Sequence, residues 1–422
     1  MLSTSKVAVA GEELLSLLKD EKGGLMMELG ISSISYYKSD STGFQKATVA
    51  LRAQLEKVVR ANPWIVGRLV STKEGIKCSH PASPNTEDID AIFSTSSPDK
   101  YSASTPFMKT CKDLYTKGRL IVPDGYTLTD KDRPVTMLTL SETSPEEFSL
   151  IFSMSHVIAD GRTYYEIYKM LAPGAEVRSL VVERIQTFSE IMKERCGRRE
   201  LAWADSASTA LLFTFTMMCN SAAKCFAFYL DEDRVKKAKS DEATAGGVEY
   251  VTTNDILTSG FFNATNARIG MMGYDCRDKL DNIVGDLAGN YVTALVLDSG
   301  VFGTPASLRK MYSAPPGTPF TTAKKPLPTF PNCCGGNGNF AMVTNWSSFA
   351  QTLIEFEGCE LDIHLPIQHP DYCVYDLMIP FSSGTGKKGV MIWTVNADEA
   401  GLREVLPIGA SVSEKLFPKT LT

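Results

Sequence analysis

The chain lacks any apolar run long enough to cross a membrane. Its most apolar stretch, ALLFTFTMMC at residues 210–219, has about half of the roughly 20 residues that a transmembrane helix needs. We expect this stretch to form a buried helix or a helix in peripheral contact with a membrane. The opening residues, MLSTSKVAVAGEELLSLLKDEK, reach acidic side chains before any long apolar core forms, so we also expect no secretory signal.

The chain also lacks an excess of positive charge. The 43 lysines and arginines are outnumbered by 49 aspartates and glutamates, which gives a formal net charge of −6. A nucleic-acid-binding surface needs clustered Lys and Arg. The strongest basic cluster, RVKKAK at residues 234–239, directly follows the acidic DED and is typical of one solvated helix face. We therefore expect no nucleic-acid partner.

Patterns typical of metal sites are missing. The ten cysteines are scattered, with no C-x-x-C pair, and the adjacent Cys333 and Cys334 fall in a Gly-rich segment that is expected to be a loop. His364 and His369 are separated by Pro366 and do not share a helix face. We expect no metal site, and we expect reduced thiols in an intracellular, cytoplasmic protein.

Signatures of other enzyme classes are absent too. The chain has no G-x-S-x-G nucleophile turn and no G-x-x-x-x-G-K-[ST] phosphate loop. The segment GGNGNF at residues 335–340 has the wrong spacing for a dinucleotide fingerprint, and no helix is expected after it. These absences argue against a Ser-His-Asp hydrolase and against an NAD-dependent enzyme.

What is present is globular composition over 422 residues, 43% of them apolar and 22% charged, which favours two domains or one large one. No repeat of fixed period is visible, and each half mixes strands with a few helices. The pattern of the first half predicts a helix over residues 45–61 that stops at Asn62-Pro63, strands over residues 64–70, 135–142 and 148–156, and a helix beginning near residue 160 with Asp160 or Thr163 as its cap.

The second half has the same style. Residues 184–224 are the best candidate for a crossover between the halves, and residues 313–339, rich in Pro and Gly, predict a long loop. The remaining patterns predict strands over residues 225–230, 342–349 and 389–396, a helix capped by Thr253 or Asn254, and two further strands before and after the segment GYDCRDKL.

One of only four histidines follows a predicted strand in the sequence SHVIADG, residues 155–161. His156 would sit at the end of a buried strand, and rigid scaffolds often hold catalytic groups there. Gly161 would permit positive φ or close backbone approach after Asp160. A histidine held this way suits general-base catalysis, but a packed core histidine beside a tight turn fits the same residues. These residues alone leave both interpretations open.

Together with four companion segments, H-x-x-x-D-G after a strand resembles the signature of the chloramphenicol-acetyltransferase-like acyltransferases. That superfamily includes BAHD acyltransferases, wax-ester synthases and peptide-synthetase condensation domains. The companions arrive in the BAHD order and span most of the chain: LRAQLEKVVRANPWIVGRLV (residues 51–70), YVTTNDILTSGFFNAT (250–265), YDCRDKLDNIVGDLAGNYV (274–292) and MVTNWSSF (342–349).

The resemblance implies an α/β (α+β sandwich) fold with two pseudo-equivalent domains, mixed sheets and an active-site tunnel at their interface. Residues 1–195 would form the N-terminal domain that carries the motif, residues 196–224 the crossover and residues 225–422 the C-terminal domain. Because one chain would build both walls of the tunnel, we expect a monomer.

The resemblance also implies a mechanism. His156 would act as the general base that removes a proton from an acceptor hydroxyl or amine, which then attacks the thioester of acyl-coenzyme A without a covalent acyl-enzyme. The donor is a co-substrate, so no cofactor stays bound. Asp160 would pair with Arg277 of the D-x-R segment, and Gly161 would keep the loop tight. Candidates for stabilising the oxyanion are Thr344, Asn345, Trp346 and Ser347.

Two departures from the BAHD pattern matter. In place of D-F-G-W-G the chain has EFEGCELD at residues 355–362, in which only Phe356 and Gly358 match. Ser155 occupies the position of the first histidine of condensation domains and wax-ester synthases, which favours a coenzyme A donor. A carrier-protein-dependent condensation or release domain and a non-catalytic binding protein of the same fold remain alternatives. Apolar and aromatic stretches suggest a lipophilic acceptor, although a core explains them equally well.

Overall fold

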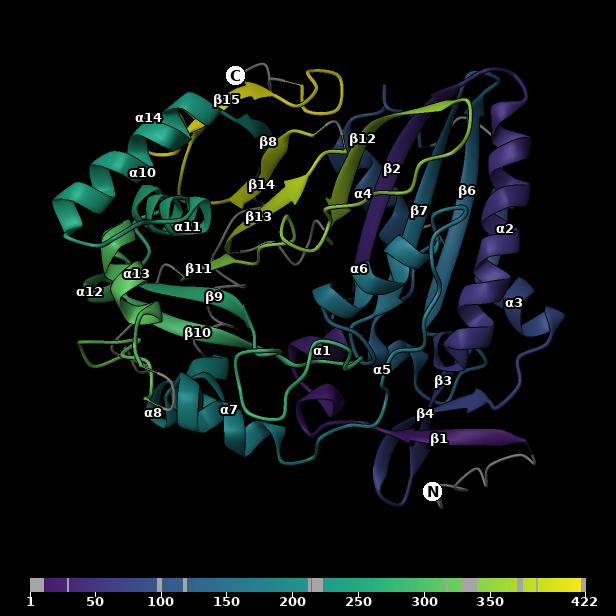
Figure 1. Cartoon of the computed structure of the whole chain (residues 1–422), viewed down its shortest axis with the longest axis horizontal. Helices are drawn as coiled ribbons and strands as arrows, with labels where there is room; N and C mark the ends of the chain where they lie inside the picture. Colours follow the sequence, from purple (N-terminus) through teal and green to yellow (C-terminus); the bar gives the residue numbers. More distant parts are fainter. Residues whose placement is uncertain are drawn as a thin grey trace.

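The computed structural model describes residues 11–28, 30–96, 101–116, 120–211, 214, 223–315, 318–327, 340–369, 375–384 and 386–418. Within them the chain forms three β-sheets, of five, seven and three strands. The five-stranded and seven-stranded sheets lie in opposite halves of the molecule, each with its own helices, as Figure 1 shows. This is a mixed α/β architecture, as the sequence predicts.

The five-stranded sheet has the order β12-β2-β7-β6-β5 and is antiparallel except for the pair β5 and β6. Its central strands are buried on both faces because helices cover each side. Ser33 and Ser35 of β2 bond tyrosines of α6, while the neighbouring Tyr36 lies beside Thr110 of α4. The elements are β2 (Gly30–Ser39), α2 (Gly43–Ala61), α3 (Thr86–Ile92), β5 (Phe93–Ser96), α4 (Phe107–Thr116), α5 (Gly125–Leu128), β6 (Thr136–Ser144), β7 (Glu147–Ser155), α6 (Gly161–Met170) and β12 (Cys359–Ile367).

The seven-stranded sheet has the order β10-β9-β11-β13-β14-β8-β15, with β11 parallel to both of its neighbours. Figure 1 shows α10, α11 and α13 stacked on the outer side of this half. The elements are β8 (Lys224–Leu230), α10 (Glu232–Gly246), α11 (Thr253–Ala264), β9 (Ile269–Asp275), β10 (Val292–Asp298), α12 (Ser299–Phe302), α13 (Pro305–Tyr312), β11 (Phe340–Val343), β13 (Asp376–Ser382), β14 (Lys388–Thr394), α14 (Glu399–Val405) and β15 (Ile408–Ser411).

A small sheet of order β1-β4-β3 packs below the first half, and two helices fall in the predicted crossover region. Two short 3₁₀ turns, η1 and η2, complete the set. The elements are β1 (Glu12–Ser16), η1 (Asp20–Lys22), α1 (Leu25–Glu28), η2 (Pro63–Val66), β3 (Arg68–Thr72), β4 (Gly75–Pro81), α7 (Phe188–Cys196) and α8 (Arg198–Ala204).

Three local predictions need correction. The segment WIVGRLV is not one strand: Pro63 opens the turn η2, since its fixed φ suits a first helical position, and the strand β3 begins only at Arg68. The late strand ends at Val343, one residue before Thr344. Helix α11 is capped by Thr252, whose side chain accepts a hydrogen bond from the Asp255 amide in a capping box.

The predicted domain limits remain a prediction, but one strand does not follow them. β12 comes from the last quarter of the chain and pairs along its length with β2 of the first half, from Cys359 opposite Ser39 to Ile367 opposite Ser32. Figure 1 shows β12 beside β2 at the boundary between the halves. β12 therefore links the two halves: it belongs to the chain segment of the second half and is hydrogen-bonded to the sheet of the first.

No helix among the described residues is long and apolar enough to span a membrane. Most of the apolar stretch at residues 210–219 lies outside the described residues, as do Cys333 and Cys334 and much of the predicted loop over residues 313–339. The prediction of a peripheral membrane contact is therefore not tested.

Candidate active site

His156 stands directly after β7, at the boundary between the two halves. The last residue of β7, Ser155, pairs with Gly30 at the start of β2. A short loop follows, and α6 begins at Gly161, with Asp160 as its N-cap through a 2.9 Å bond from the Thr163 amide. The predicted order of strand, histidine, loop, capping aspartate and helix is present.

Asp160 and Arg277 form a buried ion pair between the halves, with Arg277 Nη1 2.7 Å from Asp160 Oδ2. Asp160 Oδ2 also accepts the Tyr291 amide at 3.0 Å, and Arg277 donates to the Gly289 carbonyl at 2.8 Å. Burial by itself would raise the pKa of Asp160, but the charge and hydrogen bonds of Arg277 hold that pKa below its usual value. Both carboxylate oxygens are engaged, so Asp160 holds the loop and is not free to act on a substrate.

His156 is a partly exposed residue, and its Nδ1 atom is buried without a hydrogen-bond partner among the described residues. This leaves Nε2 as the ring nitrogen that can face a substrate. Burial lowers the pKa of His156 below the ordinary value of 6.5, and the nearby backbone oxygens together with the negative charge of Asp160 only partly offset this effect. The imidazole is therefore neutral at pH 7, which is the form that accepts a proton.

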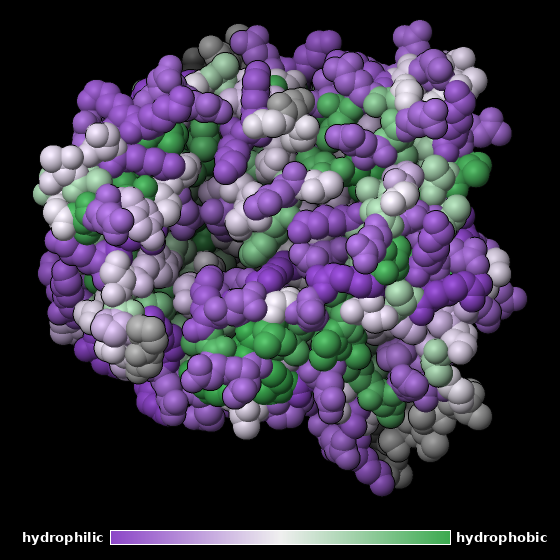
Figure 2. All heavy atoms as spheres, in the orientation of Figure 1, coloured by the Kyte–Doolittle hydropathy of each residue, from purple (hydrophilic) through white to green (hydrophobic). Residues whose placement is uncertain are grey.

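A cavity of about 850 Å³ lies at His156. Its walls come from both halves of the chain: Met26, Ile31 and His156 on one side, Thr293, Thr344 and Trp346 on the other. Figure 2 shows a hollow on one face of the molecule, left of its centre, with hydrophobic side chains gathered in a band below it. The histidine thus faces a space large enough for two reactants, which a packed core histidine would not.

Three of the four oxyanion candidates line this cavity: Thr344, Asn345 and Trp346. Ser347 is not in its wall, and its hydroxyl donates to Asn345 Oδ1 at 2.7 Å. The Asn345 amide in turn donates to Asn254 Oδ1 at 3.0 Å. The Thr344 hydroxyl has no hydrogen-bond partner among the described residues. The Thr344 hydroxyl and the Trp346 indole N–H are therefore the candidate donors that remain for a substrate oxygen among the described residues.

Gly161 does not have the role predicted for it. Its φ is not positive, because it is already the first residue of α6, and no backbone atom crowds it. A Cβ there would stand 3.8 Å from Trp346 and from Phe349 of the opposite half. The glycine therefore leaves space in the cavity wall and does not tighten the loop.

The cavity also has a cationic region that the sequence reasoning missed. It comprises Arg162, Arg195, Lys279 and Arg309. Arg162 and Arg309 pair with carboxylates of Asp275 and Asp255, respectively. Lys279 donates to a backbone carbonyl and lies 4.4 Å from the centroid of the Tyr274 ring.

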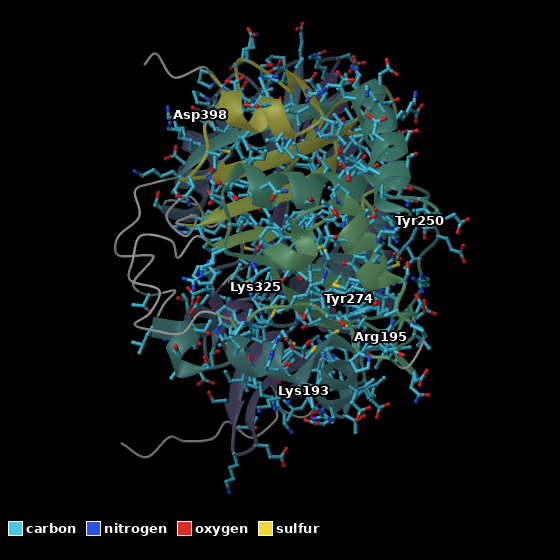
Figure 3. The ribbon with its side chains drawn as sticks, turned by 90° about the vertical axis from the view of Figure 1, so that its left-hand side faces the viewer. Lys193, Arg195, Tyr250, Tyr274, Lys325 and Asp398 are labelled. Atoms are coloured by element: carbon cyan, nitrogen blue, oxygen red, sulfur yellow. The ribbon has the colours of Figure 1, made fainter. Side chains whose placement is uncertain are left out.

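Arg195 stacks 4.2 Å above the Phe320 ring, which contacts the Tyr274 ring edge-on. Figure 3 shows Arg195 and Tyr274 near one another on the side of the second half. Arg162 follows Gly161 in the sequence, and Lys279 lies in the D-x-R segment. Their positions within these motifs could have marked both residues as candidates for the cavity wall.

No cluster of metal-ligating side chains exists among the described residues. His364 is fully buried, with Nδ1 2.8 Å from Ser35 Oγ and Nε2 3.0 Å from the Tyr165 hydroxyl. The described cysteines are free thiols, four of them buried. His364 is a satisfied core histidine, the interpretation that His156 does not fit.

No protein-family model and no curated protein matches the chain in sequence. Solved structures do match it over nearly its whole length. TRI101 of F. graminearum complexed with ethyl coenzyme A gives a TM-score of 0.57 at 14% identity, over 95% of this chain and 100% of that one. The same enzyme complexed with coenzyme A and T-2 mycotoxin gives 0.55, also at 14% identity and with the same coverage.

The first condensation domain of the CDA synthetase gives a TM-score of 0.53 at 13% identity, over 93% of each chain. The chain has the two-domain chloramphenicol-acetyltransferase-like fold. At these identities the likeness concerns the fold, and it supports the BAHD resemblance seen in the motifs.

Proposed function

We propose that the chain transfers an acyl group from acyl-coenzyme A to the hydroxyl or amine of a small, lipophilic acceptor. The observation that carries this proposal is the partly exposed His156, whose Nδ1 has no partner among the described residues, in the wall of a cavity of about 850 Å³ lined by both halves. A neutral histidine with access to two reactants is what general-base catalysis of a direct transfer needs. Because one chain supplies both walls, we propose that it acts as a monomer.

The chemical step balances without a bound cofactor. His156 Nε2 takes the proton as the acceptor oxygen or nitrogen attacks the thioester carbonyl, and Thr344 donates to the oxyanion that forms. The C–S bond then breaks, and the protonated His156 returns its proton to the sulfur of the departing coenzyme A. Holding both reactants in the correct geometry beside the His156 imidazole supplies a large further part of the rate enhancement.

The cationic region supports coenzyme A as the donor. The phosphates of coenzyme A are anionic, and Lys279 and Arg195 line the cavity without a carboxylate partner in the described residues. TRI101, which shares the fold, has been solved with coenzyme A and its ethyl derivative.

The condensation-domain likeness keeps a second candidate, a carrier-protein donor. The two donors differ in the part beyond pantetheine, because a carrier protein offers a surface where coenzyme A offers a nucleotide. Ser155 in place of the first histidine disfavours the carrier-protein reaction. A non-catalytic binding protein would bind the donor without releasing thiol.

The experiment compares the same acyl group on coenzyme A, on pantetheine and on a phosphopantetheinylated carrier protein, with a panel of alcohols and amines. We expect acceptor-dependent thiol release that is fastest with the coenzyme A thioester. Replacing Lys279 by Met should raise the KM for acyl-coenzyme A and leave the KM for acyl-pantetheine unchanged. Faster release from the carrier protein than from coenzyme A would establish the second candidate.

A further inference from the structure

A second buried ion pair lies beside the His156 loop, and the mechanism above does not use it. Arg184 Nε lies 3.0 Å from Oε2 of Glu21 and 3.1 Å from Oε1, and both side chains are completely buried. The pair joins η1 near the N-terminus to the start of the crossover region. Burying two charges costs desolvation free energy, which the attraction between them and their further hydrogen bonds must offset. The partners in those hydrogen bonds therefore indicate which part of the structure the pair stabilises.

Besides two local bonds, from the Leu18 amide to Glu21 and from Arg184 to the Val182 carbonyl, the pair bonds to groups around the active site. Arg184 Nη1 donates to the Ala288 carbonyl at 2.7 Å, and Nη2 donates to the Ile158 carbonyl at 3.1 Å. Glu21 Oε1 accepts the backbone amide of Asn290 at 2.9 Å and its side-chain amide at 3.1 Å. Ile158 belongs to the loop between His156 and Asp160.

Asn290 carries the connection to the histidine itself. Its Nδ2 atom donates to the His156 carbonyl at 2.7 Å as well as to Glu21. The His156 loop is therefore bound at two carbonyls, at His156 through Asn290 and at Ile158 through Arg184. Glu21 orients the amide that makes the first of these bonds.

Residues 288–291 are held from two sides by two ion pairs. Arg184 binds the Ala288 carbonyl and Arg277 the Gly289 carbonyl, while Glu21 binds the Asn290 amide and Asp160 the Tyr291 amide. The Arg184 guanidinium packs against Gly289, whose φ is +120° and where a Cβ would stand only 2.5 Å from Arg184 Cζ. The second pair thus complements the first on the same four residues.

We propose that Glu21 and Arg184 are positioning residues for His156, acting through Asn290 and the Ile158 carbonyl to fix the backbone that aims the imidazole into the cavity. The catalytic part of this proposal rests on the proposed function. The positional part does not, since it concerns where the ring sits whether or not the chain turns over.

The test uses Glu21→Gln, which keeps the shape of the side chain and removes its charge, and Arg184→Lys as a milder variant. Asp298→Asn is the matched control, because Asp298 is also a buried carboxylate that accepts two backbone amides, but at Lys324 and Lys325, away from His156. Two readouts are measured: kcat and KM with acyl-coenzyme A, and titration of the histidine ring by NMR. The chain has only four histidines, and His156→Ala assigns the relevant signal.

We expect Glu21→Gln to lower kcat by about 10- to 100-fold with KM changed by less than about threefold, since a misplaced catalytic group loses rate more than binding. We also expect its His156 ring to titrate closer to the ordinary value, because a loosened loop admits water. Arg184→Lys should show both effects more weakly, and Asp298→Asn neither. If Glu21→Gln does not fold, the smaller effects expected of Arg184→Lys, in the same directions, decide the test.

A folded variant with unchanged kcat and unchanged His156 titration would overturn the proposal. A fall in kcat with an unchanged His156 titration would also overturn it, because the loss would then come from general destabilisation. Absence of transfer in the wild type, with every donor, would count against the proposed function alone, and the NMR titration would still decide the positional role.

Discussion

His156 lines a cavity, and its Nδ1 has no hydrogen-bond partner among the described residues. His364 of β12, in contrast, is hydrogen-bonded to protein groups through both ring nitrogens. The position of His156 depends on Glu21, Arg184 and Asn290, which lie far apart in the sequence. Substitutions of single residues at this site therefore test the activity most directly.

The pH dependence of the rate follows from the lowered pKa of His156. A base must be neutral to accept a proton, so the rate falls as pH drops through its pKa. Because burial holds that pKa below 6.5, we expect log(kcat/KM) to stay level from pH 8 down to at least about pH 6.5 and to fall with unit slope once the pH is below the pKa of His156. A profile of kcat/KM against pH checks this, and an acid limb centred above pH 7 would be inconsistent with His156 as described.

Replacing Thr344 tests the oxyanion donor. Thr344→Val keeps the shape and removes the hydroxyl, and we expect kcat to fall by about 10²–10³-fold, as when one such donor is lost in other enzymes. Thr344→Ser is the control and should retain most of the activity. Equal kcat values for the Val and Ser variants would assign the oxyanion to another donor.

Asp160→Asn should affect stability first. It removes the buried carboxylate at 2.7 Å from Arg277 and leaves the guanidinium with Asp275 alone, at 2.9 Å. Breaking a buried pair typically costs about 3–5 kcal/mol of unfolding free energy. Chemical denaturation of the variant and the wild type measures the difference. Glu56→Gln, which removes an exposed i,i+4 partner of Arg60, is the control and should leave the midpoint unchanged. An unchanged midpoint for Asp160→Asn as well would contradict a structural role for Asp160.

At the scale of elements, β12 is the feature that joins the halves. It crosses from the second half to pair with β2, and His364 at its centre is bonded to Ser35 of β2 and Tyr165 of α6. Trp346 packs on the same tyrosines from the cavity side. The cluster of His364, Ser35 and Tyr165 therefore supports one wall of the active site.

This cluster predicts a pH-dependent contribution to stability. Burial lowers the pKa of His364 to about 3, whereas in the unfolded chain it is about 6.5. Between these values the unfolded state binds a proton that the folded state does not, so wild-type stability falls as pH falls, by up to about 1.4 kcal/mol per pH unit. His364→Gln lacks this contribution. Unfolding free energies measured from pH 7 to pH 4.5 should show the gap between wild type and variant narrowing; a constant gap would contradict this account.

Short patterns carried the parts of the structure that the sequence could predict. Asp160 as a helix cap after a strand, and Arg277 as its partner, depend on motifs a few residues long. The turn η2 was missed because Trp64, Ile65 and Val66 are all apolar and a buried strand shows the same run. Thr252 was missed by one position, although its spacing from Asp255 fits a capping box.

Long-range partners could not be read from the sequence. Glu21 and Arg184 are 163 residues apart, and no local pattern marks either as buried, since isolated charged residues are usually exposed. The pairing of β12 with β2 spans over 300 residues and depends on how two separately formed sheets meet. The cationic region arises in the same way, from several elements that converge on one cavity.

At the scale of the whole molecule, the two halves matter because neither encloses the cavity alone. One half supplies His156 and the other supplies Thr344 and most of the cationic region. The two buried ion pairs and β12 hold the halves in register across this space. Direct transfer between two bound substrates, with no covalent intermediate, requires that both fit at once.

The most direct measurement is therefore coenzyme A release by wild type and His156→Ala, side by side, with acyl-coenzyme A in the presence and absence of an acceptor. We expect release that depends on the acceptor in the wild type, with no burst of thiol in its absence, and loss of about 10²–10⁴-fold in a variant that still folds and binds the donor. A folded His156→Ala with undiminished acceptor-dependent release would contradict the assignment of His156 as the base.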